Sequence, residues 1–217
     1  FSRYWMHNAF LNIDNKKMSK SLGNFFTVRE ISEKYDLQGL RFFMLSAHYR
    51  SPLNFSAELM EASKNGLDRI ITAADLLKRL AGNGEGELTE AEEALLREAK
   101  TYVQKFEEAM DDDFNTADAI SAIFELVKFS NIHAADAHSQ RFFAALREEL
   151  VTLCDILGII VEKKEEILDE DIEKLIAERQ AARKEKNFAR ADEIRDELLA
   201  RGIVLKDTRE GVVWTRA

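Results

Sequence analysis

The chain has 217 residues, of which 46% are hydrophobic and 33% are charged, and it contains nine glycines and one proline. This composition excludes a disordered or collagen-like chain and is sufficient for one or two domains with packed cores. No apolar run approaches the roughly 20 residues that a membrane span needs, so we expect no membrane partner. The single cysteine, Cys154, lies in an apolar stretch, which indicates a buried thiol, no internal disulfide and a reducing, cytoplasmic location.

The net charge of −9 is unevenly distributed along the chain. Residues 1–50 carry eight Lys or Arg against four Asp or Glu, and residues 178–217 carry ten against eight, so the acidic excess lies in the middle. Phosphate contacts require cationic side chains. We therefore expect a polyanionic partner to bind the two ends of the chain and to avoid its centre.

The first informative segment is the stretch from Lys16 to Asn24, which places three lysines beside two serines and a glycine. Lysine ammonium groups act as mobile point charges, and hydroxyls and free backbone amides can donate hydrogen bonds to oxyanions. We expect Gly23 to permit close approach of the backbone. A phosphate-binding loop is one interpretation of this segment, and a solvated basic hairpin tip is the other.

A long amphipathic helix is predicted from Ser56 to Leu80, because apolar residues recur there every three or four positions. The glycine-rich segment 82–86 predicts a flexible linker after it. Thr89 and Glu92 form the pattern of a capping box at the start of a second helix.

Two more helices complete the middle of the chain, the third capped by Asn115 or Thr116 and the fourth by Ser139. Four one-sided helices with short connections predict an antiparallel four-helix bundle over residues 56–160. The overall fold is therefore expected to be mainly α.

Acidic residues and histidines in this region raise the question of a metal site. Asp111, Asp112 and Asp113 could hold a divalent cation, but we favour acids at a helix start, where they accept orphan amides. His133 and His138 have no third ligand within reach in the sequence. We therefore expect no metal site in this chain.

A charged connector, residues 161–168, is expected to lead to a small α+β domain over residues 169–217, with two helices and a final β-hairpin. In the second helix Phe188, Asp192 and Arg195 are spaced to share one face. A ring, a carboxylate and a guanidinium on one face are suited to reading single-stranded bases. The alternative is that Phe188 belongs to the core and Arg195 is a surface ion-pair partner.

The pentapeptide Lys-Met-Ser-Lys-Ser at residues 17–21 is the signature of class I aminoacyl-tRNA synthetases, and its surroundings resemble the cysteinyl-tRNA synthetase family. The resemblance spans the whole chain in order. It rests on the blocks Tyr4–Asn8, Leu22–Arg29, Tyr49–Ser56, Met110–Thr116, Ala181–Arg195 and Gly202–Asp207.

This resemblance implies ATP- and magnesium-dependent activation of cysteine to cysteinyl-adenylate, followed by transfer to tRNA(Cys). It implies that Lys20 contacts the nucleotide with Lys17 as its helper, that Met18 packs, and that Ser19 and Ser21 hold the loop. These five residues are the expected ATP site, with Lys17 and Lys20 catalytic.

The resemblance also implies a division of the chain into functional parts. Residues 1–55 would be the end of the catalytic domain with a stem-contact region, 56–160 a tRNA-binding bundle, and 169–217 an anticodon-binding domain. The family's ATP motif and its zinc ligands are expected upstream, so we expect a C-terminal fragment, inactive alone, from a monomeric enzyme. The anticodon contacts are expected at Arg183, Phe188, Asp192, Arg195 and Asp207.

Two other functions stay open from the sequence. One is a cysteine ligase that acts on a small amine acceptor, which would not need residues 170–217. The other is a tRNA-binding module without catalysis.

Overall fold

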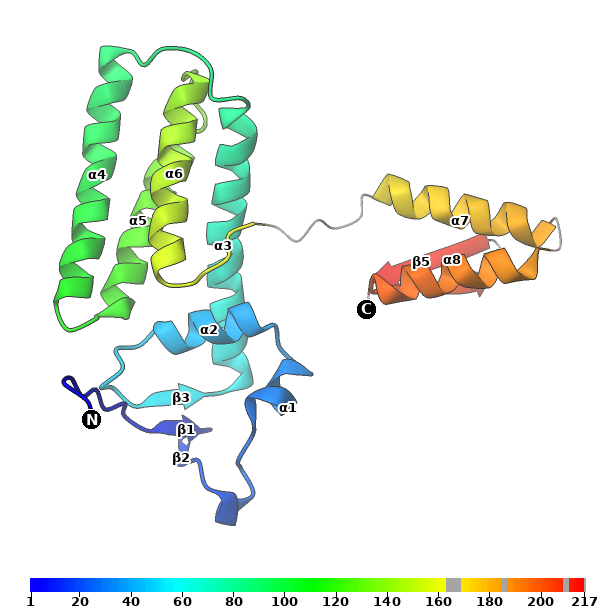
Figure 1. Cartoon of the computed structure of the whole chain (residues 1–217), viewed down its shortest axis with the longest axis horizontal. Helices are drawn as coiled ribbons and strands as arrows, with labels where there is room; N and C mark the ends of the chain where they lie inside the picture. The colour runs from blue at the N-terminus through cyan, green and yellow to red at the C-terminus, as the bar shows by residue number, and fades with distance from the viewer. Residues whose placement is uncertain (163–168, 185–186, 209–210, 217) are drawn as a thin grey trace. The chain divides into compact units, whose positions relative to one another are not determined.

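The computed structural model describes residues 1–162, 169–184, 187–208 and 211–216. The chain divides into two compact units, Phe1–Lys163 and Lys164–Ala217. Within the described residues the elements are mainly helices, with one three-stranded and one two-stranded sheet (Figure 1). The expected mainly α fold is confirmed. No helix of the described part is long and apolar enough to cross a membrane.

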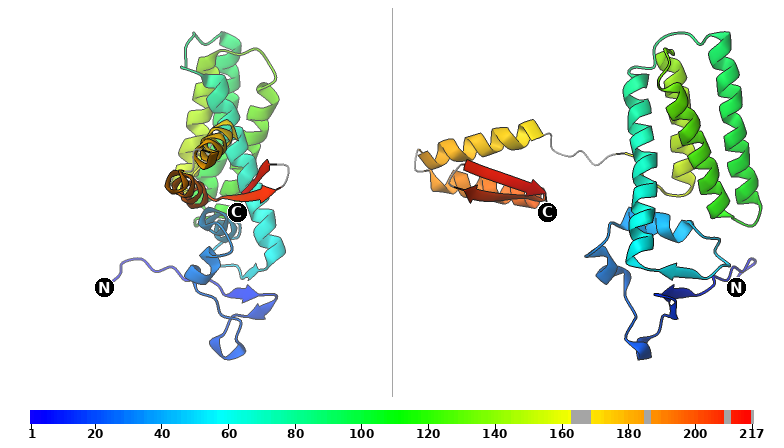
Figure 2. Two further views of the ribbon diagram at one scale, coloured as in Figure 1. Left: turned by 90° about the vertical axis from the view of Figure 1, so that its right-hand side faces the viewer. Right: turned by 180° about the vertical axis from the view of Figure 1, so that it is seen from behind.

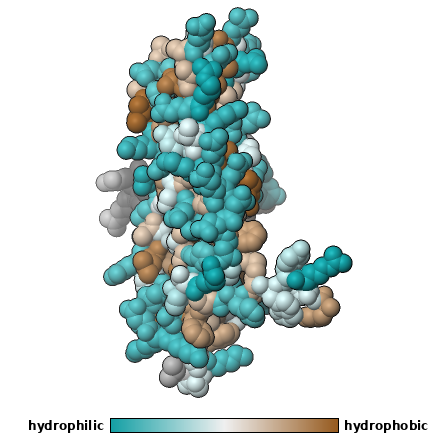
Figure 3. Space-filling model, turned by 90° about the vertical axis from the view of Figure 1, so that its left-hand side faces the viewer, coloured by the Kyte–Doolittle hydropathy of each residue, from teal (hydrophilic) through white to brown (hydrophobic). Residues whose placement is uncertain are grey.

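The first unit contains an antiparallel bundle of four helices: α3 (Ala57–Ala81), α4 (Glu90–Asp111), α5 (Thr116–His133) and α6 (Gln140–Ile156) (Figures 1 and 2). Its core is apolar and closely packed, and Cys154 is fully buried in it. Seen from the side on which α4 lies, the surface is mostly hydrophilic, with small separate hydrophobic patches (Figure 3). One-sided helices that bury their apolar faces against one another explain this arrangement.

The four helices begin where the capping residues predicted. Ser56 accepts a hydrogen bond from the Leu59 amide, Thr89 and Glu92 form a complete capping box, Asn115 caps α5 and Ser139 caps α6. These caps satisfy amides that have no partner inside the helix.

The connection between α3 and α4 differs from the flexible linker that its glycines predicted. The Glu85 amide donates to Gln140 Oε1 at 3.3 Å, so the loop is held against the start of α6. A Cβ built at Gly82 would lie 2.9 Å from the Gln140 side chain. The glycines therefore provide positive φ angles and space for this contact.

Glu92 joins the start of α4 to the start of α6 at the same end of the bundle. It is only 4% exposed, and its carboxylate accepts from the Thr89 amide at 2.8 Å and from the Ser139 amide at 2.6 Å. Burial alone would raise the pKa of Glu92, but hydrogen bonds from Thr89 and Ser139 outweigh it and lower the pKa to about 2. The carboxylate is therefore ionised at neutral pH.

The region before the bundle is a small sheet with two helices, α1 (Val28–Ser32) and α2 (Leu37–Leu45). The sheet has the order β2-β1-β3, with β1 (Leu11–Ile13) antiparallel to β2 (Lys16–Lys17) and parallel to β3 (Leu53–Phe55). Its core contains Ile13, Phe43, Phe55 and Met60, the last from α3. The boundary proposed at residue 55 therefore lies inside one compact unit.

The three aspartates lie at the end of α4, which corrects the expectation that they start a helix. Asp111 is the last residue of α4, and Asp113 has a positive φ of 57°. Asp113 Oδ1 accepts from the Tyr49 hydroxyl at 2.8 Å, and Oδ2 pairs with Arg50. Asp113 thus ties the segment before β3 to the bundle, which the sequence did not indicate.

The start of the expected connector is also different in the structure. Val161 is 5% exposed and belongs to the bundle core with Ile159, so the packed bundle extends past residue 160. Residues 163–168 lie outside the described residues.

The second unit contains two helices and a β-hairpin, as predicted from the sequence. Its elements are α7 (Asp169–Lys184), α8 (Phe188–Ala200), β4 (Ile203–Thr208) and β5 (Gly211–Arg216), with the two strands antiparallel. The core of this unit is formed by Ile172, Ile176, Ile194, Leu198 and Ile203.

Candidate functional site

The lysine-rich loop is carried by the β1–β2 hairpin. Asp14 and Asn15 form its turn with positive φ angles of 48° and 62°, which suit a two-residue turn between antiparallel strands. The Asn15 amide also donates to Asn54 Oδ1 at 2.7 Å, which joins the turn to β3. The loop therefore starts from a fixed position on the sheet.

One asparagine closes the loop after the hairpin. Asn24 Nδ2 donates to the Lys17 carbonyl at 3.2 Å, and Asn24 Oδ1 accepts from the Ser19 amide at 2.9 Å. Ser19 also caps the short helix η1 (Lys20–Leu22) by accepting from the Ser21 amide, and the two hydroxyls lie 2.6 Å apart. The backbone of residues 17–24 is thus held by its own side chains.

The side chains of the loop point to two environments. Met18 is partly buried against the core that contains Ile13 and Phe43, whereas Lys17 and Lys20 are exposed. Lys17 Nζ lies 5.3 Å from the centroid of the Phe10 ring, and Lys20 Nζ lies 5.4 Å from that of Phe25. Such distances allow a cation–π attraction.

No carboxylate of the described residues forms a salt bridge with Lys16, Lys17 or Lys20. The three ammonium groups therefore form a local positive charge that is not compensated within this part of the chain. An anion with several oxygens is the ligand that this arrangement fits.

Gly23 has a conformational role within the loop itself. Among the described residues no atom lies within 4 Å of a Cβ built at this position. Its φ is 68°, and its amide donates to the Lys20 carbonyl at 3.2 Å. The glycine is explained by the left-handed backbone that ends η1.

The expected anticodon contacts fall on the second unit. Phe188, at the start of α8, is 61% exposed, which rules out the alternative that it is a core residue. Asp192 and Arg195 are exposed on the same helix and pair at 3.6 Å. Arg183, near the end of α7, is exposed, and Asp207 lies in β4 opposite Val212.

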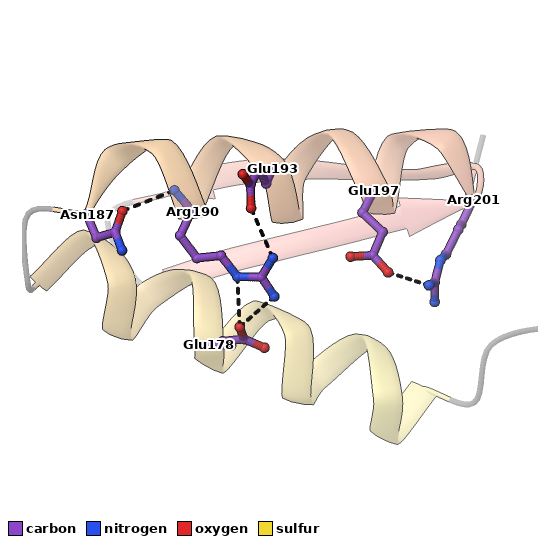
Figure 4. A network of polar contacts seen from close by, with 6 residues as sticks. All are labelled: Glu178, Asn187, Arg190, Glu193, Glu197 and Arg201. Carbon is purple, nitrogen blue, oxygen red and sulfur yellow. Dashed lines mark hydrogen bonds and ion pairs between the residues drawn. The ribbon is translucent and has the colours of Figure 1, made fainter.

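A neighbouring arginine has a structural task in this unit. Arg190 donates to Glu178 on α7 at 2.8 and 3.1 Å and to Glu193 at 3.1 Å (Figure 4). These contacts raise the pKa of Arg190 and join α7 to α8. Arg190 therefore holds α7 and α8 together, whereas Phe188 and Arg195 are exposed to solvent.

Sequence reasoning missed two residues that shape the candidate sites. The closure of the lysine loop by Asn24 has no signal in a single sequence. Asp136 lies beside His133 and His138, and one potential ligand atom of each of the three residues lies within 4.8 Å of the others. The expectation that no third ligand is in reach of the histidines is therefore wrong.

Three family models match consecutive parts of the chain. Residues 1–65 match the class I (C) tRNA synthetase catalytic domain, 105–162 the DALR domain, and 165–214 the cysteinyl-tRNA ligase anticodon binding domain. The resemblance to the cysteinyl-tRNA synthetase family is confirmed. The lysine loop lies in the first match, part of the bundle in the second and the hairpin unit in the third.

Curated relatives agree over the entire chain. A cysteine–tRNA ligase of Lachnospira eligens is 67% identical over 218 residues, which is 100% of this chain and 46% of that protein. Those of Lachnoclostridium phytofermentans and Clostridioides difficile are 59% and 51% identical, again over 100% of this chain and 47% of each relative. The chain thus spans about half the length of these cysteinyl-tRNA synthetase relatives.

A solved structure shares part of the fold. The ternary complex of Agrobacterium radiobacter K84 agnB2 LeuRS with tRNA and LeuAMS matches with a TM-score of 0.58 at 19% identity, covering 70% of this chain and 20% of that one. At this identity the match concerns the fold alone.

Proposed function

We propose that this chain is part of a cysteine–tRNA ligase, in which it supplies the lysine loop for ATP and two tRNA-binding parts. The observation that carries the proposal is the uncompensated lysine loop, set in a chain that aligns over its full length with cysteine–tRNA ligases. The missing half of the enzyme would hold cysteine and the rest of the ATP site.

The loop would act on the activation step. When the carboxylate of cysteine attacks the α-phosphate of ATP, negative charge develops on the pyrophosphate that leaves. Cations that meet this charge stabilise the transition state more than the ground state and thereby raise the rate. Lys20 is the proposed principal contact and Lys17 its helper, while Met18 anchors the loop and Ser19 and Ser21 shape it.

Zinc and magnesium have different places in this proposal. The family's cysteine-selecting zinc would need a thiolate ligand, but burial raises the pKa of Cys154, the only cysteine here, to about 12. Cys154 does not fit that role, so we place the zinc ligands outside this chain. Magnesium would arrive with ATP.

Exposed apolar side chains at the beginning of the first unit support the proposal that further parts of an enzyme pack against this region. Large hydrophobic residues exposed by 40% or more are concentrated at the beginning of the first unit, namely Phe1, Tyr4, Trp5, Met6, Phe10, Phe25, Phe26 and Val28. Concentrated exposed apolar surface marks an interaction site. We propose that the rest of the catalytic domain covers it.

The second unit is the proposed reader of the tRNA(Cys) anticodon. Its exposed Phe188 offers a ring on which a base can stack, and Arg183, Asp192, Arg195 and Asp207 offer polar groups for base edges. An anticodon reader is needed for tRNA but not for a small amine acceptor, so this unit disfavours the small-amine alternative. A monomeric enzyme in the cytoplasm stays our prediction.

The role of the lysine loop in cysteine activation is tested by Lys20→Ala in a full-length enzyme that includes this chain. Loss of one phosphate-directed cation should slow cysteine-dependent ATP–pyrophosphate exchange by about 100-fold, equivalent to roughly 3 kcal/mol. Lys34→Ala is the matched control, because Lys34 is an exposed lysine just after α1 and outside the loop. Normal exchange by Lys20→Ala would refute the catalytic role of the loop.

The anticodon role is tested separately with Phe188→Ala and Arg195→Ala. Removal of a stacked ring should weaken tRNA binding by about 1 to 3 kcal/mol and slow aminoacylation, while adenylate formation stays normal. Phe188→Trp keeps a ring and should retain activity. Normal aminoacylation by both alanine variants would show that this face is not the reader.

The dependence on the missing half has its own test. The 217-residue chain alone should show no ATP–pyrophosphate exchange above background, because the proposed cysteine site lies outside it. Exchange by a clean preparation of the chain would place the complete active site within these residues and overturn the proposal.

A further inference from the structure

The connection between α5 and α6 brings two imidazoles and a carboxylate together. His133 is the last residue of α5, Asp136 lies in the connection, and His138 directly precedes the capping residue of α6. His133 Nδ1 and Asp136 Oδ2 are 3.7 Å apart, and one potential ligand atom from each of the three residues lies within 4.8 Å of the others. This is a compact set of three donors of the kind that binds transition metals.

The two imidazole rings are held in place by aromatic packing. The centroid of the His138 ring lies 4.4 Å from that of Phe142, and the His133 centroid lies 4.5 Å from that of Phe129. The two histidine side chains are only 15% and 19% exposed. Donors whose rotamers are set by packing lose little freedom when they bind a ligand.

The two nitrogens of His138 lie in different environments. Nδ1 lies 3.5 Å from Glu92 Oε1, whereas Nε2 is buried and has no hydrogen-bond partner among the described residues. A buried polar atom without a partner requires an explanation. Metal-binding histidines commonly direct their other ring nitrogen at a carboxylate, which fixes the ring and leaves the second nitrogen for the metal. Glu92 and His138 have this arrangement.

We propose that His133, Asp136 and His138 bind one divalent transition-metal ion, with Zn²⁺ as the best match. Two imidazole nitrogens and one carboxylate oxygen form a normal zinc ligand set, completed by water. Bond lengths of about 2.0 to 2.2 Å require the donors to move closer together. Asp136, which is 63% exposed, is the ligand free to make that movement. The ion would join the end of α5 to the start of α6 and, through Glu92, to the start of α4.

The test is a titration of the tag-free 217-residue chain with Zn²⁺ by isothermal titration calorimetry, after treatment with a chelator and its removal. We expect one equivalent to bind. Asp136→Asn should weaken the affinity at least 10-fold, and a His133→Ala, His138→Ala double variant should abolish stoichiometric binding. Glu92→Gln should weaken binding by about 10- to 100-fold, as expected for a residue that positions a ligand.

His7→Ala is the matched control, because His7 is an exposed histidine outside the cluster and its loss should leave the titration unchanged. Zn²⁺ in excess over its dissociation constant should also raise the melting temperature of the parent chain by more than that of Asp136→Asn. Asp136 is exposed, so its substitution leaves the fold intact and gives a clear answer. Equal zinc binding by the parent and Asp136→Asn, or no binding by the parent, would overturn the proposal.

Discussion

Glu92 gives the sharpest test of how this bundle is held together. Its buried carboxylate accepts the amides of Thr89 and Ser139 and so joins the first turns of α4 and α6. Glu92→Ala removes the acceptor of two part-buried hydrogen bonds and leaves the amides of Thr89 and Ser139 without it. An unsatisfied buried amide costs about 1 to 3 kcal/mol.

The size of the effect follows from the pKa of this group. A fall from 4.5 in a free side chain to about 2 in the fold corresponds to roughly 3 kcal/mol of stabilisation at neutral pH, at 1.36 kcal/mol per pKa unit. We therefore expect Glu92→Ala to lower the free energy of unfolding of the first unit by about 3 kcal/mol.

Cys154 provides an assay that reports on this unit alone. It is the only cysteine, is fully buried in α6 and becomes accessible to a thiol reagent when the bundle opens. When opening is in rapid equilibrium, the labelling rate follows the population of the open state. A loss of about 3 kcal/mol should raise the labelling rate on the order of 100-fold, since about 1.4 kcal/mol corresponds to tenfold.

The pH dependence has a defined sign. Because the pKa of Glu92 is lower in the folded state, its contribution is present above pH 4.5 and is lost as the pH falls toward 2. The difference in unfolding free energy between the parent and Glu92→Ala should therefore shrink across this window. A disulfide reagent that reacts with thiols in acid allows the same labelling assay there.

Glu93→Ala is the control, since Glu93 carries the same charge in the same helical turn but is 54% exposed. Surface substitutions usually change stability by less than about 0.5 kcal/mol. If Cys154 is labelled equally fast in Glu92→Ala and Glu93→Ala, the buried carboxylate does not stabilise the bundle as we argue.

Four further substitutions probe other features. Gly158→Ala should destabilise the first unit by about 1 to 2 kcal/mol, because φ is +65° there, whereas the helical Gly39→Ala should stabilise it by about 0.5 to 1 kcal/mol; urea denaturation measures both. Tyr49→Phe should cost about 1 kcal/mol by removing the hydrogen bond to Asp113, which the thiol-labelling assay detects. Gly23→Ala, at a φ of 68°, should slow pyrophosphate exchange by the proposed full-length enzyme while labelling stays unchanged.

Local signals in the sequence were sufficient for the helices and their starts. Ser56, Thr89, Asn115 and Ser139 cap the helices as predicted, because a cap depends on residues within one turn of the chain. The hairpin after Gly202 was also predicted from a local signal, namely two apolar runs separated by a short polar turn. These features are encoded by neighbours in the sequence.

Contacts between distant segments were not predictable from one sequence. The parallel pairing of Leu11 with Leu53 and the hydrogen bond from Tyr49 to Asp113 depend on how far-apart segments fold together. The nearness of Asp136 to the two histidines depends on the conformation of a turn. Periodicity and composition carry no information on such distances.

The junction between β3 and α3 connects the bundle directly to the sheet that carries the lysine hairpin. Only Ser56 separates the strand that ends at Phe55 from the helix that begins at Ala57, and β3 is paired with β1 of the hairpin. With 25 residues, α3 is about 37 Å long at 1.5 Å per residue. A tilt of about 5° at the junction moves the far end by roughly 3 Å on this geometry. The distant end of the bundle is therefore connected to the hairpin through α3 and two paired strands, β3 and β1.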